Sequence, residues 1–262
     1  MKTALITGAS SGIGKELAYL MAQDKVNLIL VARSIGKLQE IANEIKTNYN
    51  VDVEVVECDL SDPSAAKKLF DLVTNKGLSV DILVNNAGFG DLDKFSVEKL
   101  AKYESMLNLN ILALTQLTAL FGEKMKLQKT GHILNVASTA AFQPLPYFSV
   151  YAATKAYVLS FSEALHYELK NFGVNVSALC PGPTATNFAK AADIKTSAMF
   201  EENKGGMSAK KVAQIAYKKL KKRKMTIVTG FLNKLNAYLS PKMPARCFIP
   251  KIMEKQFKKM IK

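Results

Sequence analysis

The chain has 262 residues, of which 48% are hydrophobic and 22% are charged. These values are typical of globular proteins, and the length allows one large α/β domain or two small ones. Every apolar run is shorter than the roughly eighteen residues that span a bilayer. The N-terminus lacks the long apolar stretch and the cleavage site of a signal peptide. The composition therefore predicts neither a membrane-spanning nor a secreted protein.

The net charge of +14 is concentrated near the C-terminus. Residues 205–262 hold 16 of the 36 Lys and Arg residues but only one of the 22 acids. Such a segment bears on partners rather than on the core fold. Three interpretations stay open: a solvated surface, an oligomer contact or a lid over the substrate, and weak attachment to anionic membrane through the basic run at 218–224. No recognition motif accompanies the charge, so we predict no nucleic-acid binding.

The three cysteines, Cys58, Cys180 and Cys247, stand far apart in the chain. Their odd number and their spacing match neither a disulfide framework nor a metal site. We expect free thiols in a reducing cytoplasm and no bound metal. His132 and His166 have no ligand partner at a useful spacing, so we expect both to be structural.

Short apolar runs alternate with segments of helical period along most of the chain. The predicted strands are residues 4–7, 27–32, 53–57, 82–85, 132–137 and 174–179, and the predicted helices between them are 14–23, 37–49, 64–74, 96–127 and 150–171. This alternation predicts βαβ units and a parallel sheet with helices on both faces. We therefore expect a single Rossmann-type, doubly wound α/β domain of about seven strands over residues 1–262.

The chain changes character after Pro181-Gly182-Pro183, which breaks it behind a strand. Residues 187–206 are expected to form a flap over the substrate. Ser208 is then expected to cap a helix that ends near 222, followed by a last strand at 225–229. Amphipathic helices are predicted at 231–240 and 245–261, within a basic C-terminal extension over about 231–262.

A glycine-rich turn follows the first strand, in Thr7-Gly8-Ala9-Ser10-Ser11-Gly12-Ile13-Gly14. Glycines at a strand-to-helix junction let the backbone approach a pyrophosphate, which can then lie at the positive helix N-terminus. The turn therefore favours nucleotide binding.

The second strand ends in Val31-Ala32-Arg33-Ser34, with Lys37 one turn further on. An acid at this place holds the ribose 2′-hydroxyl of NAD, whereas an arginine accommodates the 2′-phosphate of NADP. Arg33 therefore predicts NADP(H). The fourth strand ends in Asn85-Asn86-Ala87-Gly88, whose small and amide residues would let a ligand lie over the strand ends.

Tyr151 and Lys155 are four residues apart, and Ser138 precedes Tyr151 by thirteen. On a helix, the phenol and the ammonium would project from the same face. We expect the cation to lower the pKa of the phenol, because reversible ketone and alcohol chemistry needs a hydroxyl that can give or take a proton.

These motifs, in this order and spacing, resemble the short-chain dehydrogenase/reductase family over roughly residues 1–190. The resemblance rests on the glycine turn at 7–14, on Asp59, on the Asn85–Gly88 motif, and on Asn110, Ser138, Tyr151, Lys155 and the stretch Pro181-Gly182-Pro183-Thr184-Ala185-Thr186. It implies that Tyr151 is the general acid and base, that Ser138 orients the substrate carbonyl, that Lys155 holds the nicotinamide ribose, and that Asn110 holds a water beside Lys155.

The resemblance also implies a set of cofactor-binding residues around the turns. They are Gly8, Ser10, Ser11, Gly12, Ile13, Gly14, Arg33, Ser34, Lys37, Asp59, Leu60, Asn86, Ala87, Gly88, Tyr151, Lys155, Pro181, Gly182, Thr184 and Thr186. One departure concerns Ser11, since some NADP-dependent members have a basic residue there. NADP preference therefore depends on Arg33 and Lys37. The family further implies a homodimer or homotetramer packed through the helices of Asn110 and Tyr151.

The substrate is expected to lie over Ser138 and Tyr151. The candidate wall residues are apolar, with no charged clamp: Thr139, Phe142, Pro144, Phe148, Phe188 and Met199. They favour an apolar ketone, aldehyde or secondary alcohol, and so an NADPH-dependent carbonyl reductase or alcohol dehydrogenase. Two alternatives stay open: a 3-oxoacyl-thioester reductase whose basic surface meets an acyl carrier protein or coenzyme A, and a non-enzymatic NADP(H) sensor or scaffold.

Overall fold

The computed structural model describes residues 1–192, 194, 206–239, 250, 253–254 and 257–258. Within them, seven parallel strands form one sheet in the order β3-β2-β1-β4-β5-β6-β9. The strands are β1 (Thr3–Thr7), β2 (Asn27–Ala32), β3 (Val53–Glu57), β4 (Ile82–Asn85), β5 (Gly131–Val136), β6 (Val174–Cys180) and β9 (Thr226–Val228). The predicted doubly wound parallel sheet is therefore confirmed.

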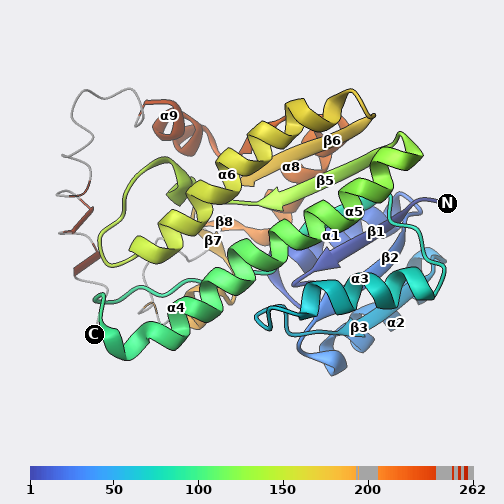
Figure 1. Ribbon diagram of the computed structural model, residues 1–262, viewed down its shortest axis with the longest axis horizontal. Helices are drawn as coiled ribbons and strands as arrows, with labels where there is room; N and C mark the ends of the chain where they lie inside the picture. The colour runs from blue at the N-terminus through green and yellow to red at the C-terminus, as the bar shows by residue number, and fades with distance from the viewer. Residues whose placement is uncertain (193, 195–205, 240–249, 251–252, 255–256, 259–262) are drawn as a thin grey trace.

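Helices cover both faces of this sheet. They are α1 (Gly12–Gln23), α2 (Ile35–Tyr49), α3 (Ala65–Asn75), α4 (Leu100–Leu107), α5 (Leu114–Gln128), α6 (Ser149–Lys170), α7 (Phe188–Ala191), α8 (Ala209–Lys221) and α9 (Phe231–Leu239). In Figure 1, α3, α5 and α6 cross in front of the sheet. The short strands β7 (Thr184–Ala185) and β8 (Met207–Ser208) pair outside it.

The core has two layers because neighbouring strand residues point to opposite faces. Ala4 and Ile6 of β1 pack in one cluster with side chains from α1, α2 and α8. Leu5, between them, packs in the other cluster with side chains from α3 and α5. Burial on both faces explains why these strands show continuous apolar runs in the sequence.

The middle helical segment differs from the prediction of one uniform helix at 96–127. A 3-10 turn, η1 (Val97–Lys99), leads into α4, and a π-helical turn, η2 (Asn108–Ala113), joins α4 to α5. Single π-helical turns within α-helices are frequent at functional sites. Here the turn contains Asn110, which is buried.

This same segment, Val97–Gln128, is long and apolar enough to cross a membrane by length and composition, with a mean hydropathy of 1.2. No such segment was expected from the sequence, because Asn, Thr and Gln residues interrupt every apolar run here, whereas the many Leu, Ile and Ala residues keep the mean hydropathy high. Of the 18-residue apolar stretch within this segment, 44% is buried within the protein. Leu117, Phe121 and Met125 of α5 lie in the core, as in a core helix.

The C-terminal predictions are borne out where the structure describes them. α8 begins after Ser208, whose side chain accepts a hydrogen bond from the Lys211 amide, and β9 and α9 follow. Of the helix predicted at 245–261, residues 250, 253–254 and 257–258 are described, and they are helical. Met199 and most of the flap predicted at 187–206 lie outside the described residues.

The basic run at 218–224 ends α8 and directly precedes β9. It therefore lies at the amino edge of the parallel sheet. The residues after the strands, including Gly8, Arg33, Ser138 and Pro181, lie at the opposite, carboxyl edge. The predicted functional residues and the densest positive charge are thus at different ends of the strands.

Candidate functional site

A cavity of about 570 Å³ opens at the carboxyl edge of the sheet. Ligands of doubly wound folds bind at this edge, because the loops after the strands meet there. One part of the cavity is lined by the glycine turn and the ends of β2 and β3, and another by Ser138, Tyr151 and apolar side chains. The cavity therefore has two parts with different linings.

The glycine turn between β1 and α1 is shaped for close approach. Gly8 and Gly12 have φ of 65° and 57°, a region that favours glycine. A Cβ on Gly14 would lie 2.6 Å from the Gly8 carbonyl oxygen, so Gly14 acts through packing and does not line the cavity. Ser11 caps α1 without a side-chain hydrogen bond to the helix. The first amides of α1 thus remain available to an anion.

Asn86 fastens this turn to the end of β4. Its side-chain amide donates hydrogen bonds to the carbonyl oxygens of Thr7 and Gly8, at 3.0 and 3.2 Å. The Thr7 hydroxyl accepts from the Asn86 and Ala87 amides, both at 3.0 Å. The Asn86 side chain therefore fixes the conformation of the glycine turn. Ala87 and Gly88, which follow Asn86, line the cavity.

The structure separates the two basic residues on which NADP preference was predicted to depend. Arg33 and Ser34 line the cavity at the end of β2, whereas Lys37 is exposed and does not line it. Lys37 projects elsewhere because α2 begins at Ile35 and carries it along the helix. Burial raises the pKa of Asp59, but hydrogen bonds from Ser61 and the nearby Arg33 charge outweigh burial and lower it. The Arg33 guanidinium therefore lies near an anionic carboxylate at the cavity wall.

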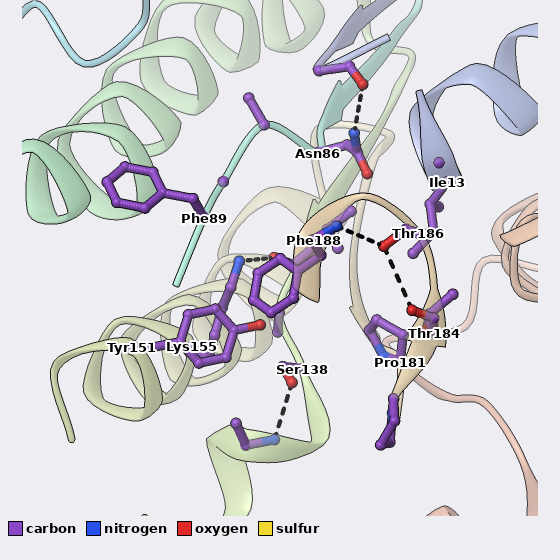
Figure 2. A pocket seen from close by; sticks show the side chains of 18 of the residues that line it. Ile13, Asn86, Phe89, Ser138, Tyr151, Lys155, Pro181, Thr184, Thr186 and Phe188 are labelled. Atoms are coloured by element: carbon purple, nitrogen blue, oxygen red, sulfur yellow. Dashed lines mark hydrogen bonds between the residues drawn. The ribbon is translucent and has the colours of Figure 1, made fainter. Parts of the chain in front are cut away.

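Ser138, Tyr151 and Lys155 converge in the other part of the cavity (Figure 2). Ser138 follows β5 and caps the short 3-10 helix η3 (Thr139–Phe142), where its hydroxyl accepts from the Ala140 amide at 3.1 Å. Tyr151 and Lys155 lie one turn apart on α6 and are 7% and 5% exposed. The Lys155 ammonium donates to the Val136 carbonyl at 2.8 Å and lies 5.7 Å from the centre of the Tyr151 ring.

Burial dominates the protonation of this pair. It raises the pKa of Tyr151 to about 12, against a smaller lowering by a hydrogen bond with Ser138. It also lowers the pKa of Lys155 to about 8. The expected lowering of the Tyr151 pKa by the lysine is therefore wrong for this structure, because desolvation disfavours the phenolate more strongly. At neutral pH, Tyr151 is a phenol and Lys155 a cation.

Asn110 lies behind this group and does not line the cavity. Its amide donates to the Phe89 carbonyl at 2.9 Å and to the Thr154 hydroxyl at 3.1 Å, and its oxygen accepts from the Phe89 amide at 3.2 Å. A Cβ on Gly88 would lie 3.0 Å from the Asn110 oxygen and 3.5 Å from the Lys155 nitrogen. Asn110 thus ties the loop after β4 to α6, close to Lys155.

Most of the predicted substrate wall lines the cavity. Thr139, Phe142, Phe148 and Phe188 do so, but Pro144 does not. Pro144 is exposed, and its neighbours Gln143 and Leu145 line the cavity instead. Successive side chains of an extended segment point to opposite sides, which explains the exchange. The Phe148 ring faces the Tyr151 ring.

Thr184 and Thr186 bring the segment after β6 over the glycine turn. The Thr186 hydroxyl accepts from the Phe188 amide at 3.2 Å, and a Cβ on Gly12 would lie 3.1 Å from the Thr186 methyl carbon. Both threonines line the cavity together with Pro181 and Gly182.

Five described residues of the C-terminal extension line the cavity although the sequence did not predict them there. They are Asn233, Asn236, Ala237, Met253 and Phe257, and further missed residues, Phe89, Leu92, Leu109 and Ile194, come from earlier loops and helices. The amphipathic pattern of 231–240 predicts a helix but does not say what its inner face covers. Their position supports the lid among the three interpretations of this extension.

The sheet and the cavity at its carboxyl edge place the protein in the dinucleotide-binding class. The chain belongs to the short-chain dehydrogenase family, whose model, described as short chain dehydrogenase, matches residues 2–196. The predicted family membership is confirmed.

Several characterised proteins are similar to this chain. A very-long-chain 3-oxoacyl-CoA reductase from Rattus norvegicus is 34% identical over 200 residues, covering 71% of this chain and 61% of the relative. A 17-beta-hydroxysteroid dehydrogenase type 3 from Mus musculus is 32% identical over 203 residues, covering 76% and 65%. The alignments thus span less than two thirds of these relatives. A solved short-chain dehydrogenase from Sphingobium yanoikuyae, in complex with NADPH, has a TM-score of 0.82 at 31% identity, covering 92% of this chain and 93% of its own.

Proposed function

We propose that this protein is an NADP(H)-dependent oxidoreductase that interconverts an apolar ketone or aldehyde and the corresponding alcohol. The observation that carries the proposal is the convergence of the Ser138 hydroxyl, the Tyr151 phenol and the Lys155 ammonium in a cavity that also contains the glycine turn. The wall around Ser138 and Tyr151 is apolar, and among its described residues Lys155 is the one charged side chain, which favours an apolar substrate.

The residues fit a dinucleotide. Gly8, Gly12 and the uncapped N-terminus of α1 would hold the pyrophosphate, and Arg33 would hold the 2′-phosphate. Lys155 would hold the nicotinamide ribose. The nicotinamide, when bound, supplies the hydride to the carbonyl carbon. The protein's contribution is to position the reactants and to stabilise charge.

In reduction, negative charge grows on the carbonyl oxygen, where the Ser138 and Tyr151 hydroxyls would donate hydrogen bonds. The Tyr151 phenol would then transfer its proton to that oxygen, which yields the alcohol. The remaining phenolate would be stabilised by the Lys155 cation until a proton from solvent replaces the one transferred. Tyr151 carries its proton at neutral pH, as a general acid must before the reaction.

Reduction of a 3-oxoacyl thioester is the second candidate. It is favoured by the similarity to a very-long-chain 3-oxoacyl-CoA reductase. The basic run at 218–224 is a poor docking site for an acyl carrier or coenzyme A phosphate in that reaction, since it lies at the edge of the sheet remote from the cavity. A pure NADP(H) sensor is disfavoured, since binding alone needs no buried phenol and ammonium beside a serine.

Assembly and location remain proposals. Leu100, Leu107 and Tyr157 are exposed on α4 and α6, which supports a homodimer or homotetramer packed through these helices, to be checked by light scattering. Phe231, Leu232 and Leu235 of α9 are also exposed. These apolar side chains support the proposal of a weak contact with anionic membrane. A cytoplasmic location stays a prediction.

The proposed reaction can be tested with a panel of apolar ketones, aldehydes and 3-oxoacyl thioesters, each with NADPH and NADH, by following the nicotinamide absorbance. We expect turnover of apolar carbonyl compounds, faster with NADPH. In Tyr151→Phe the turnover should fall at least about 100-fold, as loss of general acid catalysis does, while NADPH binding stays within a few-fold. Tight NADPH binding without turnover of any substrate would refute both enzymatic candidates.

A further inference from the structure

We propose that Phe148 is a positioning residue for the Tyr151 phenol, and that Phe257 of the C-terminal extension holds Phe148 in place. The proposal rests on the proposed function of Tyr151. It replaces the view of Phe148 as a simple substrate wall.

The first observation is that two phenylalanines hold the Tyr151 ring. The Phe148 ring lies 4.3 Å from it, centre to centre, at an interplanar angle of 23°. The Phe188 ring lies at 5.3 Å and 52°. Phe148 and Tyr151 are both buried. A ring in near-parallel contact cannot tilt without separating from its neighbour, so the stack restricts the direction of the phenol hydroxyl.

The backbone around Phe148 is built for this contact. Tyr147, directly before it, has a φ of 62°, a left-handed conformation that is unfavourable for a residue with a β-carbon. The Tyr147 carbonyl accepts from the Asp93 amide at 2.9 Å, which holds this turn against the loop after β4. The turn directs Phe148 inward as the residue that caps α6.

Gly90, in that same loop, leaves room for the stack. A Cβ on Gly90 would lie 2.8 Å from the edge of the Phe148 ring and 3.0 Å from the Phe188 ring. Non-bonded carbon atoms do not approach to 2.8 Å. A side chain at position 90 would therefore displace one of the two rings that hold Tyr151. Gly90 does not line the cavity. A change there therefore tests the stack without removing any atom that a substrate would touch.

The last member of the stack comes from the C-terminal extension. The Phe257 ring lies 6.2 Å from the Phe148 ring at 67°, an edge-to-face contact, and is 6% exposed. It packs with Phe148 and Tyr151 in one apolar cluster. Phe257 thus packs against the Phe148 ring, which links the C-terminal extension to the proposed acid.

The geometry predicts an effect on kcat rather than on KM, because misplacing a reacting group by about 1 Å can cost about 100-fold in rate. In Phe148→Leu, which keeps the site apolar but removes the flat ring, kcat should fall on the order of 10- to 100-fold, with KM changed by less than about threefold. Gly90→Ala should lower kcat like Phe148→Leu, and Phe257→Leu should lower it in the same direction by less.

The measurement is steady-state kinetics with a ketone that the wild type reduces, with NADPH affinity by fluorescence and thermal unfolding as checks on folding. Phe95→Leu is the matched control, because Phe95 stacks on Tyr103 at 5.1 Å outside the cavity, and its kcat and KM should stay unchanged. If Phe148→Leu and Gly90→Ala bind NADPH but keep the wild-type kcat, or if KM alone rises, Phe148 is only a substrate wall and the proposal is overturned.

If either variant fails to bind NADPH or to unfold cooperatively, Phe257→Leu decides in its place. An unchanged kcat there would refute the link to the C-terminal extension and with it the proposal. Failure of the underlying function would look different. In that case the wild type itself would show no turnover, or Tyr151→Phe would keep its activity.

Discussion

At the Tyr151 hydroxyl, burial and hydrogen bonding act in opposite directions on the same proton. Burial raises the pKa to about 12, and the hydrogen bond with Ser138 offsets a part of that rise. Lys155 is affected in the opposite sense, because burial disfavours its charged form and lowers its pKa to about 8. Tyr151 is therefore protonated at neutral pH, and the pKa of Lys155 lies only slightly above neutral pH.

The Lys155 shift predicts a pH-dependent difference in stability. An unfolded lysine has a pKa of about 10.4, so between pH 8 and about 10 the unfolded state binds more protons than the folded state at this residue. Its contribution to the unfolding free energy therefore rises with pH in that window. The wild type should gain stability relative to Lys155→Met from pH 7.5 to 10, in denaturant unfolding without added nucleotide.

Buried Cys180, whose pKa is raised to about 12, acts in the opposite direction in both proteins. Because Lys155 lowers the Cys180 pKa and Cys180 raises the Lys155 pKa, the comparison is made in a Cys180→Ala background, where the difference between the two stability curves isolates Lys155. A difference that stays flat from pH 7.5 to 10 would contradict the lowered pKa.

Arg33 is the residue at which cofactor preference should be decided. In Arg33→Asp, loss of charge-assisted hydrogen bonds to the 2′-phosphate should weaken NADPH binding about 10- to 100-fold, and the preference should move towards NADH. Lys37→Asp is the matched control, since Lys37 lies outside the cavity lining, and its effect should be several-fold smaller. The measurement is kcat/KM for each cofactor. An unchanged ratio in Arg33→Asp would show that Arg33 does not recognise the phosphate.

At the scale of elements, the N-terminus of α1 packs against Thr186, in the segment that directly follows β7. Gly12 needs both its positive φ and its lack of a side chain, because Thr186 packs against it. The segment after β6 therefore packs on the glycine turn. The conformations of this segment and of the glycine turn depend on each other.

Gly12→Ala should therefore raise the Kd for NADPH at least about tenfold, through strain at a positive φ and the clash with Thr186. Gly36→Ala is the control, because a Cβ there meets nothing within 4 Å and lies in α2. An alanine within a helix should leave binding unchanged and raise the unfolding free energy by up to about 1 kcal/mol. The measurements are NADPH fluorescence titration and denaturant unfolding. Equal NADPH affinity in both variants would refute the close packing of this turn.

The π-helical turn η2 is a second element whose role depends on its neighbours. It places Asn110 where its amide contacts both Phe89 and Thr154. The apolar period of the sequence over 96–127 predicts a helix correctly. The apolar period does not predict the π-helical turn η2 within this helix. This turn is explained by the contacts of Asn110 with the loop after β4 and with α6.

At the scale of the whole molecule, charge and chemistry occupy opposite edges of the sheet. The cavity lies at the carboxyl edge, whereas the basic run at 218–224 precedes β9 at the amino edge. Charges separated by more than a Debye length, about 8 Å at physiological salt, are largely screened. The basic run should therefore influence partners and solubility, with little effect on catalysis.

The double variant Lys222→Glu, Arg223→Glu should accordingly keep kcat/KM within about twofold at physiological salt. It is compared with Arg33→Asp, which replaces one positive charge at the carboxyl edge by a negative charge. The assay is NADPH-dependent reduction of a ketone substrate that the wild type accepts. A loss of tenfold or more in the double variant would mean that the basic run acts on the site, and would contradict the arrangement described.

By itself, the sequence determined the elements and the motif order of this protein. Apolar runs and helical periods depend on neighbouring residues alone, so the sheet, the glycine turn and the set of Ser138, Tyr151 and Lys155 could be predicted. Tertiary structure alone decided the coverage of the cavity by Asn233 and Phe257, the exclusion of Lys37 and Pro144 from its lining, and the rise of the Tyr151 pKa. These properties depend on desolvation and on packing between residues far apart in the chain, which no local pattern records.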